Sequence, residues 1–461
     1  MLEPRVAIVY APGTQFYMAN NLHDPRPRSG HWTDQYRRAL AARDSWLNRI
    51  RPGDHIFVGS ACGEPTDLIE QLVQAVRERQ VRNVTVYQML RSGVRHLLDA
   101  AGPDLHLVGI HFHSELAGVV ERGYGSFLPI GIQQIARNID EGRIKFDVAL
   151  IQASHPDDDG HMSLGVSVDF AAQAVRQSRL VVVQVNDRSP RTRGDCSIHA
   201  SEVDVAIEVS HEIGEMEFEP ADEGARKIAR LAVDLIPDRS TIEMGIGAVM
   251  TSILEGLRER VDLGLHTGLI IEPMMDLIEA GVITNLWKGI DRGVSVANQC
   301  RGTRRLYDFL NNNPAVSMRP ASYTHDPRVL GSLRNFRAIN SAIEVDLLGQ
   351  VNSEFVAGRR VSSTGGLIDF VKSCQTTEGA RSIIALRSTA GRGKHSRIVS
   401  SLGGGVTLTA ELADIVVTEH GVADLRGMRS DQRATAMIAI ADPTFRDQLQ
   451  ESLRTQHVRP R

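Results

Sequence analysis

The stretch Ile339-Asn-Ser-Ala-Ile-Glu-Val-Asp-Leu-Leu-Gly-Gln-Val-Asn352 opens a series of four stretches that decide the fold of this chain. The others, in order, are Ser363-Thr-Gly-Gly-Leu-Ile-Asp-Phe370, Ser396-Arg-Ile-Val399 and Val417-Thr-Glu-His-Gly-Val-Ala-Asp-Leu-Arg-Gly427. Two glycine runs lie in this region, Gly365-Gly366 and Gly403-Gly404-Gly405. Because glycine has no side chain, such runs let backbone N–H groups come close to an oxyanion or a phosphate. The residues alone favour tight turns there, with Lys394 and Arg397 in a solvated loop.

The composition is that of a globular protein with more than one domain. The chain has 461 residues, of which 42% are hydrophobic and 23% charged, which predicts two or three domains with substantial cores. Its formal net charge of −4 provides no broad basic field, so a nucleic-acid partner is not expected. Arginine carries nearly all the positive charge, a bias typical of GC-rich bacterial genomes.

The cysteines and histidines do not form metal-binding patterns. Cys62, Cys196, Cys300 and Cys374 lie far apart, which argues against a disulfide framework and against a zinc site. His111 and His113 could share one face of a strand, but no carboxylate or cysteine stands at a matching spacing. No apolar run approaches the roughly 20 residues needed to cross a bilayer, and the N-terminus lacks the features of a secretory signal. We therefore expect no metal, no membrane partner and a cytoplasmic location.

Strand-then-helix units predict an α/β fold with parallel sheets. Residues 55–59 form a short apolar strand, and the following segment repeats apolar residues at helical spacing from Leu68 to Val76. The same order returns at residues 241–247, followed by a second helical segment, which indicates two related α/β halves. Further strands are expected at 147–151, 180–185, 382–386 and 415–418. The acidic stretch at 212–223 marks the expected domain boundary.

In this order, the stretches quoted above resemble the acetyl-CoA hydrolase/transferase family, which includes 4-hydroxybutyrate and succinyl-CoA:acetate CoA-transferases. The N-terminal half agrees, through residues 151–167, Asn186 and residues 190–195. The resemblance covers nearly the whole chain. It implies two related open α/β domains of the CoA-transferase type, residues 1–215 and 216–461, with the active site in the cleft between them. It also implies coenzyme A as part of an acyl-CoA substrate, a small-molecule acceptor, and a homodimer or higher homo-oligomer.

One position departs from the family pattern. In these transferases a glutamate attacks the acyl-CoA, and it directly follows a His-Ser/Thr pair. Here the corresponding segment is Leu265-His266-Thr267-Gly268, and it continues through Glu272 to Val282-Ile-Thr-Asn285. Gly268 therefore occupies the position of the nucleophile. Since glycine offers no carboxylate, the family's covalent cycle cannot start from this residue.

A second departure lies in the segment Tyr323-Thr-His325-Asp326-Pro327, which resembles the family's Asn-Asp-Pro segment. There the asparagine helps to bind the reacting carbonyl, whereas a neutral imidazole can act as a base. We therefore expect His325, assisted by His266, to deprotonate water or a small nucleophile in the space at Gly268. Backbone N–H groups near Gly365-Gly366 would stabilise the oxyanion. A purely structural role is the alternative for His325, and it is the favoured one for His266.

Three functions follow from the sequence. The first is acyl transfer from CoA to water or to a small non-CoA acceptor, without a glutamyl intermediate. The second is conventional CoA transfer between an acyl-CoA and a carboxylic acid, with Glu272 as the substitute carboxylate. The third is a non-catalytic protein that binds CoA or acyl-CoA. The family resemblance assigns CoA binding to Gly365, Gly366, Lys394, Arg397, Gly403, Gly404 and Gly405.

Overall fold

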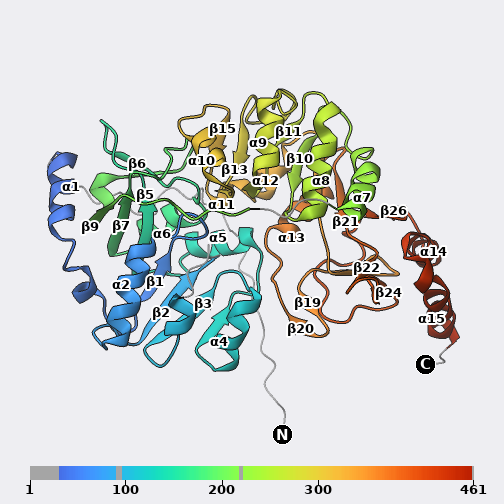
Figure 1. The fold of residues 1–461 in the computed structure, drawn as a ribbon, viewed down its shortest axis with the longest axis horizontal. Helices are drawn as coiled ribbons and strands as arrows, with labels where there is room; N and C mark the ends of the chain where they lie inside the picture. The colour runs from blue at the N-terminus through green and yellow to red at the C-terminus, as the bar shows by residue number, and fades with distance from the viewer. Residues whose placement is uncertain (1–30, 90–95, 218–221, 459–461) are drawn as a thin grey trace, which may run out of the picture.

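A computed structural model describes residues 31–89, 96–217 and 222–458. It shows an α/β protein built around two separate sheets, one on each side of Figure 1. All strands of the first sheet precede residue 216, and all strands of the second follow it. The fold class predicted from the sequence is confirmed.

The larger sheet has seven parallel strands in the order β4-β3-β2-β1-β5-β7-β9. Their bounds are His55–Val58 (β1), Val84–Gln88 (β2), Leu105–Gly109 (β3), Gly125–Phe127 (β4), Val148–Ala153 (β5), Leu180–Asn186 (β7) and Val205–Val209 (β9). Every residue of β5 and β7 is buried, because helices cover both faces of such a sheet. These helices are α1 (Trp32–Ala41), α2 (Thr66–Arg77), α3 (His96–Ala100), α4 (Ala117–Glu121), α5 (Ile132–Asp140) and α6 (Ala171–Gln177).

The second sheet has six strands in the order β11-β10-β16-β21-β25-β26, and only β26 runs antiparallel to its neighbour. Their bounds are Thr241–Met244 (β10), Gly264–Leu265 (β11), Phe336–Asn340 (β16), Arg381–Ala385 (β21), Ile415–Thr418 (β25) and Gly421–Asp424 (β26). The helices are α7 (Glu223–Val233), α8 (Ala248–Gly256), α9 (Glu272–Glu279), α10 (Arg304–Leu310), α11 (Ala321–Thr324), α12 (Pro327–Gly331), α13 (Leu367–Cys374), α14 (Ser430–Ile440) and α15 (Arg446–Val458).

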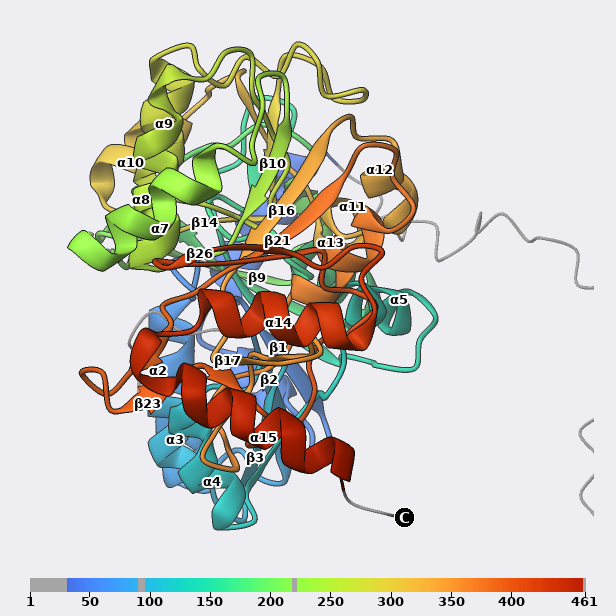
Figure 2. The ribbon, with the colours of Figure 1, turned by 90° about the vertical axis from the view of Figure 1, so that its right-hand side faces the viewer.

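Small strand pairs extend the two halves. They are β6 (His161–Ser163) with β8 (Ser197–His199), β12 (Leu269–Ile270) with β14 (Gln299–Cys300), β13 (Ser295–Ala297) with β15 (Val316–Met318), β17 (Glu344–Asp346) with β18 (Val351–Asn352) and β24 (Ile398–Val399), β19 (Phe355–Val356) with β20 (Arg359–Arg360), and β22 (Thr389–Ala390) with β23 (His395–Ser396). Figure 2 shows α14 and α15 running along one flank of the second half. No helix in the described ranges is both long and apolar enough to cross a membrane.

The two sheets share a topology, which agrees with the predicted relation between the halves. In each sheet the chain starts at an inner strand, moves outward on one side and then crosses to the other. The first strand of each sheet is therefore flanked on both sides, β1 by β2 and β5, and β10 by β11 and β16. Ligands of open α/β sheets bind beyond the carboxyl ends of the strands at such a reversal. All six strands predicted from the sequence are present, with small shifts at their ends.

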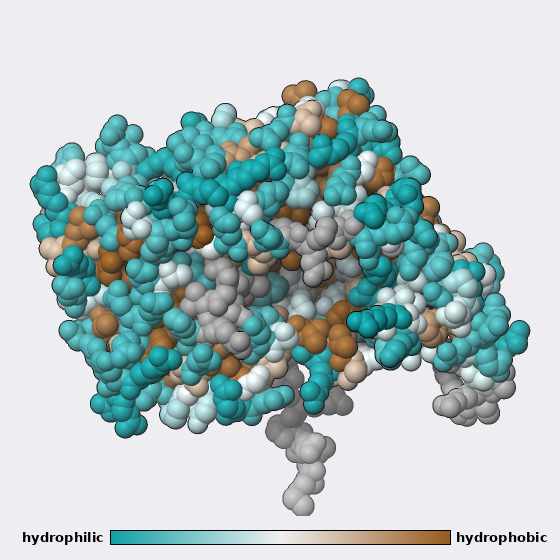
Figure 3. Space-filling model, in the orientation of Figure 1, coloured by the Kyte–Doolittle hydropathy of each residue, from teal (hydrophilic) through white to brown (hydrophobic). Residues whose placement is uncertain are grey.

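The halves pack against each other through a continuous core. One hydrophobic cluster includes Ile151 and Val183 of the first sheet together with Ile242 and Met274 of the second half. The space-filling view shows a mainly hydrophilic surface that is hollowed between the two halves (Figure 3). The halves are therefore joined by buried apolar surface, with a recess at their junction.

The carboxylate of Asp169 forms the central polar contact between the halves. Its Oδ2 accepts hydrogen bonds from the hydroxyls of Ser60 and Ser167 and from Nε2 of Gln299 at 2.7 Å, while Oδ1 accepts from Nδ2 of Asn298 at 3.2 Å. The side chain is only 2% exposed, and burial raises the pKa of its carboxyl. Its backbone oxygen accepts from the N–H of Ala321 at 2.9 Å, where α11 begins. One residue of the first half therefore positions two segments of the second.

Replacing Asp169 with asparagine should destabilise the whole protein. The new amide would present N–H groups to donors that now bind a carboxylate, so buried polar groups lose their partners. We expect the free energy of unfolding, measured by denaturant titration, to fall by about 3 kcal/mol or more. Asp158→Asn, at an exposed site, serves as the control and should change it by less than about 0.5 kcal/mol. A change below about 1 kcal/mol in Asp169→Asn would contradict this role.

Candidate active site

His325 lies at the centre of the candidate site, directly after the short helix α11. Its ring is 1% exposed and packs against Phe370 of α13, with 4.7 Å between ring centroids. Nδ1 lies 2.8 Å from the hydroxyl of Thr324. A Cβ placed on Gly366 would lie 2.6 Å from Nε2 of His325, so only glycine fits at residue 366. Nδ1 of His325 therefore contacts the neighbouring Thr324, and Nε2 faces Gly366.

Gly268 faces the same edge of His325 from the other side. A Cβ on Gly268 would lie 3.5 Å from Nε2 of His325 and 3.7 Å from Oδ1 of Asn298, both ordinary contact distances. Gly268 is not among the residues with positive φ, so the backbone does not require a glycine here. A side chain at residue 268 would therefore point between His325 and Asn298, and its absence leaves space at that place.

His266 supports the segment that carries His325. It is fully buried, and its Nε2 lies 3.0 Å from the carbonyl oxygen of Thr324. Because a carbonyl oxygen only accepts, Nε2 carries the proton and Nδ1 holds the lone pair. Among the described residues, none forms a hydrogen bond with that Nδ1. The predicted assisting histidine is thus next to His325 in space, and its hydrogen bond gives it a positioning role.

Burial keeps both imidazoles neutral. The pKa of His325 is lowered to about 3, mainly by burial and then by the nearby His266 and His111, against the opposing effect of a hydrogen bond to the Ala321 carbonyl. Burial likewise lowers the pKa of His266 to about 3, with the charge of Lys288 as the next cause. At neutral pH neither ring therefore carries a positive charge.

A third histidine comes from the first half of the chain. Nδ1 of His111 lies 2.6 Å from the hydroxyl of Ser363, and a Cβ on Gly365 would lie 3.1 Å from its Cε1. Burial lowers its pKa to about 4, followed by the charge of Arg301. From the sequence, His111 was a candidate only for a metal ligand, and its contacts with Ser363 and Gly365 were not predicted. The available signal was the apolar segment just before it, residues 105–109, which is strand β3 in the structure.

The glycines predicted to hold an oxyanion lie beside His325. Gly365 has a φ of 56°, in the left-handed region, and Gly366 directly precedes α13. The N–H groups in the first turn of a helix have no partner within the helix, and the helix dipole places partial positive charge there. The backbone at Gly365-Gly366 is therefore suited to hold negative charge next to the imidazole.

The other residues predicted to bind CoA lie away from this cluster. The N–H of Gly403 donates to Oε1 of Glu344 at 2.6 Å, and Gly404 and Gly405 lie so close to the ring of Phe355 that a Cβ on either would clash. Nε of Arg397 donates to the carbonyl of Ile343 at 2.8 Å. Lys394 is exposed in the turn between β22 and β23. No hydrogen bond or ion pair within the described ranges joins these residues to the histidines.

The carboxylate of Glu272 is engaged elsewhere. Glu272 is the first residue of α9, and its Oε1 accepts from the N–H of Thr303 at 2.7 Å and from its hydroxyl at 2.6 Å. A Cβ on Gly302 would lie 2.9 Å from this carboxylate. The structure therefore places the substitute carboxylate on a turn before α10, and no interaction within the described ranges links it to His325.

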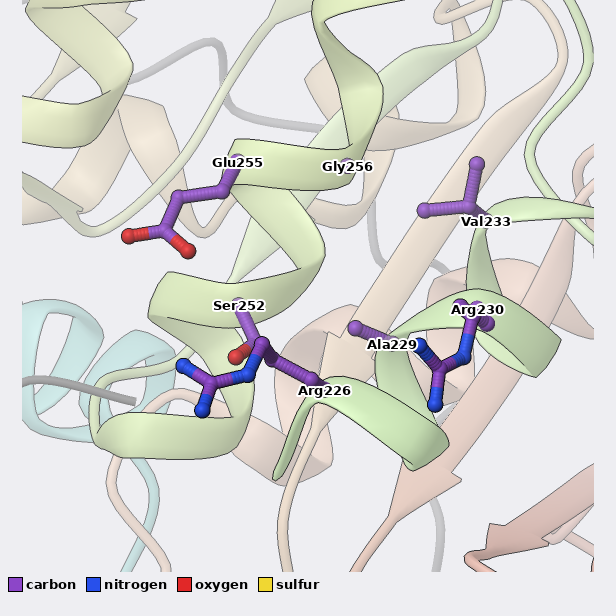
Figure 4. A pocket seen from close by; sticks show the side chains of 7 residues that line it. All are labelled: Arg226, Ala229, Arg230, Val233, Ser252, Glu255 and Gly256. Atoms are coloured by element: carbon purple, nitrogen blue, oxygen red, sulfur yellow. The ribbon is translucent and has the colours of Figure 1, made fainter. Parts of the chain in front are cut away.

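A surface pocket of about 410 Å³ lies between α7 and α8. Figure 4 shows its lining side chains, which are Arg226, Ala229, Arg230, Val233, Ser252, Glu255 and Gly256. It shares no residue with the histidine cluster. In the described part of the chain, no three His, Cys, Asp or Glu side chains gather in a way that could hold a metal ion.

Comparisons with known proteins match both halves of the chain. Residues 23–214 match the acetyl-CoA hydrolase/transferase N-terminal domain, and residues 302–453 match the acetyl-CoA hydrolase/transferase C-terminal domain. The chain is 34% identical to 4-hydroxybutyrate coenzyme A transferase of Clostridium kluyveri over 420 residues, 91% of this chain and 98% of that protein.

Two solved structures have the same fold. RipA of Yersinia pestis superposes with a TM-score of 0.86 at 30% identity, over 92% of this chain and 99% of RipA. 4-Hydroxybutyrate CoA-transferase of Porphyromonas gingivalis gives a TM-score of 0.77 at 30% identity, over 92% of this chain and 100% of that chain. The chain is therefore an enzyme of the acetyl-CoA hydrolase/transferase family, as its sequence stretches predicted.

Proposed function

We propose that this enzyme transfers the acyl group of an acyl-CoA to water or to a small non-CoA acceptor, without a glutamyl intermediate. The observation that carries the proposal is the pairing of Gly268 with His325. The position predicted for the nucleophilic glutamate holds no side chain, and the space beside it is bordered by Nε2 of a buried neutral imidazole. A water molecule or a small nucleophile in that space would meet a proton acceptor instead of a carboxylate.

The reaction proceeds by direct attack. The 2.8 Å contact between Nδ1 and the Thr324 hydroxyl allows Nδ1–H to donate. In that tautomer the lone pair of His325 lies on Nε2 and takes a proton from water as the water oxygen attacks the thioester carbonyl. N–H groups at Gly365-Gly366 hold the resulting oxyanion. When the C–S bond breaks, the imidazolium returns its proton to the thiolate. The products are the carboxylic acid and CoA thiol, or the acylated acceptor when another nucleophile replaces water.

The low pKa of His325 limits how this base can act. A group whose pKa is about 3 costs roughly 5 kcal/mol to protonate at pH 7. That cost is too large for a separate proton-transfer step in the empty site to be efficient. An oxyanion formed beside the ring would stabilise the imidazolium strongly in this buried site. Proton transfer is therefore coupled to attack on the thioester.

The second candidate function is conventional CoA transfer through Glu272. It would require Glu272 to give up both hydrogen bonds from Thr303 and to approach Gly268. The third, a non-catalytic protein that binds acyl-CoA, keeps the glycines and the cleft but assigns no task to the Nε2 edge of His325. The identity of the acceptor, the CoA-binding roles of Lys394 and Arg397, the cytoplasmic location and the homo-oligomer stay predictions.

Free thiol should be released from short acyl-CoAs in the absence of any added carboxylic acid. Because His325 is the base, His325→Asn should lower kcat for thiol release by roughly 10²- to 10⁴-fold. Thiol release is followed with a chromogenic disulfide reagent, and His96→Ala, at an exposed site, is the control variant. A new acyl-CoA that forms only with added carboxylate, without free thiol, would instead favour Glu272.

The kcat/KM for thiol release should not fall near pH 6.5, where an ordinary histidine gains its proton. Since burial lowers the pKa of His325 to about 3, its base form is fully populated above about pH 4, and kcat/KM should stay flat from about pH 5 to pH 8. A base with the ordinary histidine pKa would make kcat/KM fall tenfold per pH unit below about 6.5. A break near pH 6.5 would therefore assign the reaction to a solvated histidine.

Gly268→Glu should convert the enzyme toward covalent CoA transfer. The backbone tolerates a side chain at residue 268, and the Cβ makes only ordinary contacts, so the carboxylate can enter the space next to His325. We expect thiol release to fall at least tenfold and a CoA adduct to appear in the intact mass of the protein after incubation with acyl-CoA. Gly268→Gln fills the space without a carboxylate and should give no adduct. An adduct on the unmodified enzyme would show that another carboxylate already does this chemistry.

A further inference from the structure

Arg301 is a buried cation with two side-chain donor atoms, Nε and Nη2, that no described residue accepts from. The residue is only 6% exposed, and its Nε and Nη2 atoms are buried without an acceptor among the described residues. Buried charged groups ordinarily have partners, because loss of hydration is expensive. An arginine in this state has the donor geometry to receive an anion.

Arg337 is a buried arginine whose side-chain donors bind backbone carbonyls, as expected for a structural role. It is 9% exposed, similar to Arg301. Its Nε donates to the carbonyl of Leu235 at 3.1 Å, and its Nη1 donates to the carbonyls of Phe336 at 3.1 Å and Gly379 at 2.7 Å. Arg301 has no corresponding set of acceptors. The difference indicates that the guanidinium of Arg301 does not serve to join two parts of the backbone and is free to bind a ligand.

The acidic groups near Arg301 already have other donors. Both oxygens of Asp169 accept from neutral side chains, including Asn298 and Gln299. Oε1 of Glu64 accepts from Nε2 of Gln88 at 2.7 Å. These two carboxylates balance the charge of Arg301 through space, since both raise its pKa against the larger effect of burial. They do not occupy its N–H groups, so an incoming carboxylate can.

The backbone places Arg301 close to the reacting space. Its N–H donates to the carbonyl of Ile270 at 3.0 Å, at the end of the β12–β14 pair that begins beside Gly268. Ile270 lies two residues from Gly268, on the order of 7 Å along an extended strand. Asn298, three residues before Arg301, borders the space at Gly268 itself. The guanidinium lies near His111, since its charge lowers the pKa of that ring, and His111 in turn lowers the pKa of His325.

We propose that Arg301 binds a carboxylate group next to the reacting thioester, so that the enzyme selects substrates with a carboxylate away from the reacting carbon. The carboxylate belongs to the far end of the acyl group, as in the monothioester of a short dicarboxylic acid. This identification of the substrate class rests on the proposed function, because the cleft is assumed to hold an acyl-CoA. The planar guanidinium presents two parallel N–H groups to such a carboxylate.

The test uses two inert thioethers, S-(3-carboxypropyl)-CoA and S-butyl-CoA, which have chains of equal length and differ by the carboxylate. Isothermal titration calorimetry should show the carboxylated compound binding the wild-type enzyme at least tenfold more tightly, and Arg301→Met should remove the preference. Because thioethers do not react, this result is independent of thiol release. An enzyme that prefers the carboxylated thioether but releases no thiol would keep this proposal and contradict the proposed reaction.

Equal binding of the two thioethers by the wild-type enzyme, or a preference that Arg301→Met retains, would overturn the proposal.

Melting temperatures without ligand provide the structural control. Arg301→Met should melt closer to the wild-type temperature than Arg337→Met, because it breaks no side-chain hydrogen bond between described residues and loses only the cation that balances Asp169 and Glu64. Arg337→Met loses three hydrogen bonds and should melt several degrees below the wild type. An Arg301→Met variant that melts as low as Arg337→Met would assign the guanidinium a structural role and overturn the proposal.

Discussion

The buried carboxylate of Asp169 is the interaction on which the site depends. Its side chain fixes Asn298 and Gln299, and its backbone oxygen fixes the start of α11, which leads directly into His325. The two segments that border Gly268 therefore take their positions from one residue of the other half. A carboxylate buried this deeply is tolerated only because neutral donors surround it. The halves thus cannot shift relative to each other without breaking this network, and the space beside Gly268 keeps a defined shape.

A second constraint follows from the burial of three histidines around this space. Burial lowers the pKa of His111 to about 4 and that of His266 and His325 to about 3, so the cluster is neutral when empty. Neutral imidazoles accept or donate single hydrogen bonds but do not attract an anion from a distance. Charge recognition must then come from permanent cations and from backbone N–H groups. In the described region around Gly268, Arg301 and the glycines before α13 are suited to supply it.

The sequence predicted the fold and brought together several residues that the structure places side by side, and it failed where contacts depend on side-chain packing. The alternation of apolar strands and amphipathic helices predicted both sheets, because that pattern is a property of local segments. His325, His266, Gly268 and Gly366 were predicted together, and they lie together. The unpaired donors of Arg301 could not be predicted from the sequence, because a guanidinium without acceptors is recognised only when its neighbours in space are known. The contact of His111 with Gly365 joins residues about 250 positions apart, and no spacing rule predicts it.

Two features at one place break the usual rules of a folded core. Gly268 stands where the backbone would accept a side chain, and Arg301 keeps buried donors that nothing described here uses. Rules of packing and of polar satisfaction are broken mainly at functional sites, because selection for binding outweighs the loss in stability. Each feature alone has a structural explanation, a tolerated glycine or a buried counter-charge to Asp169. The proposal joins them in one space, open at Gly268, bordered by the neutral base and ended by the cation. Such a space fits a short acyl chain with one reacting end and one negatively charged end.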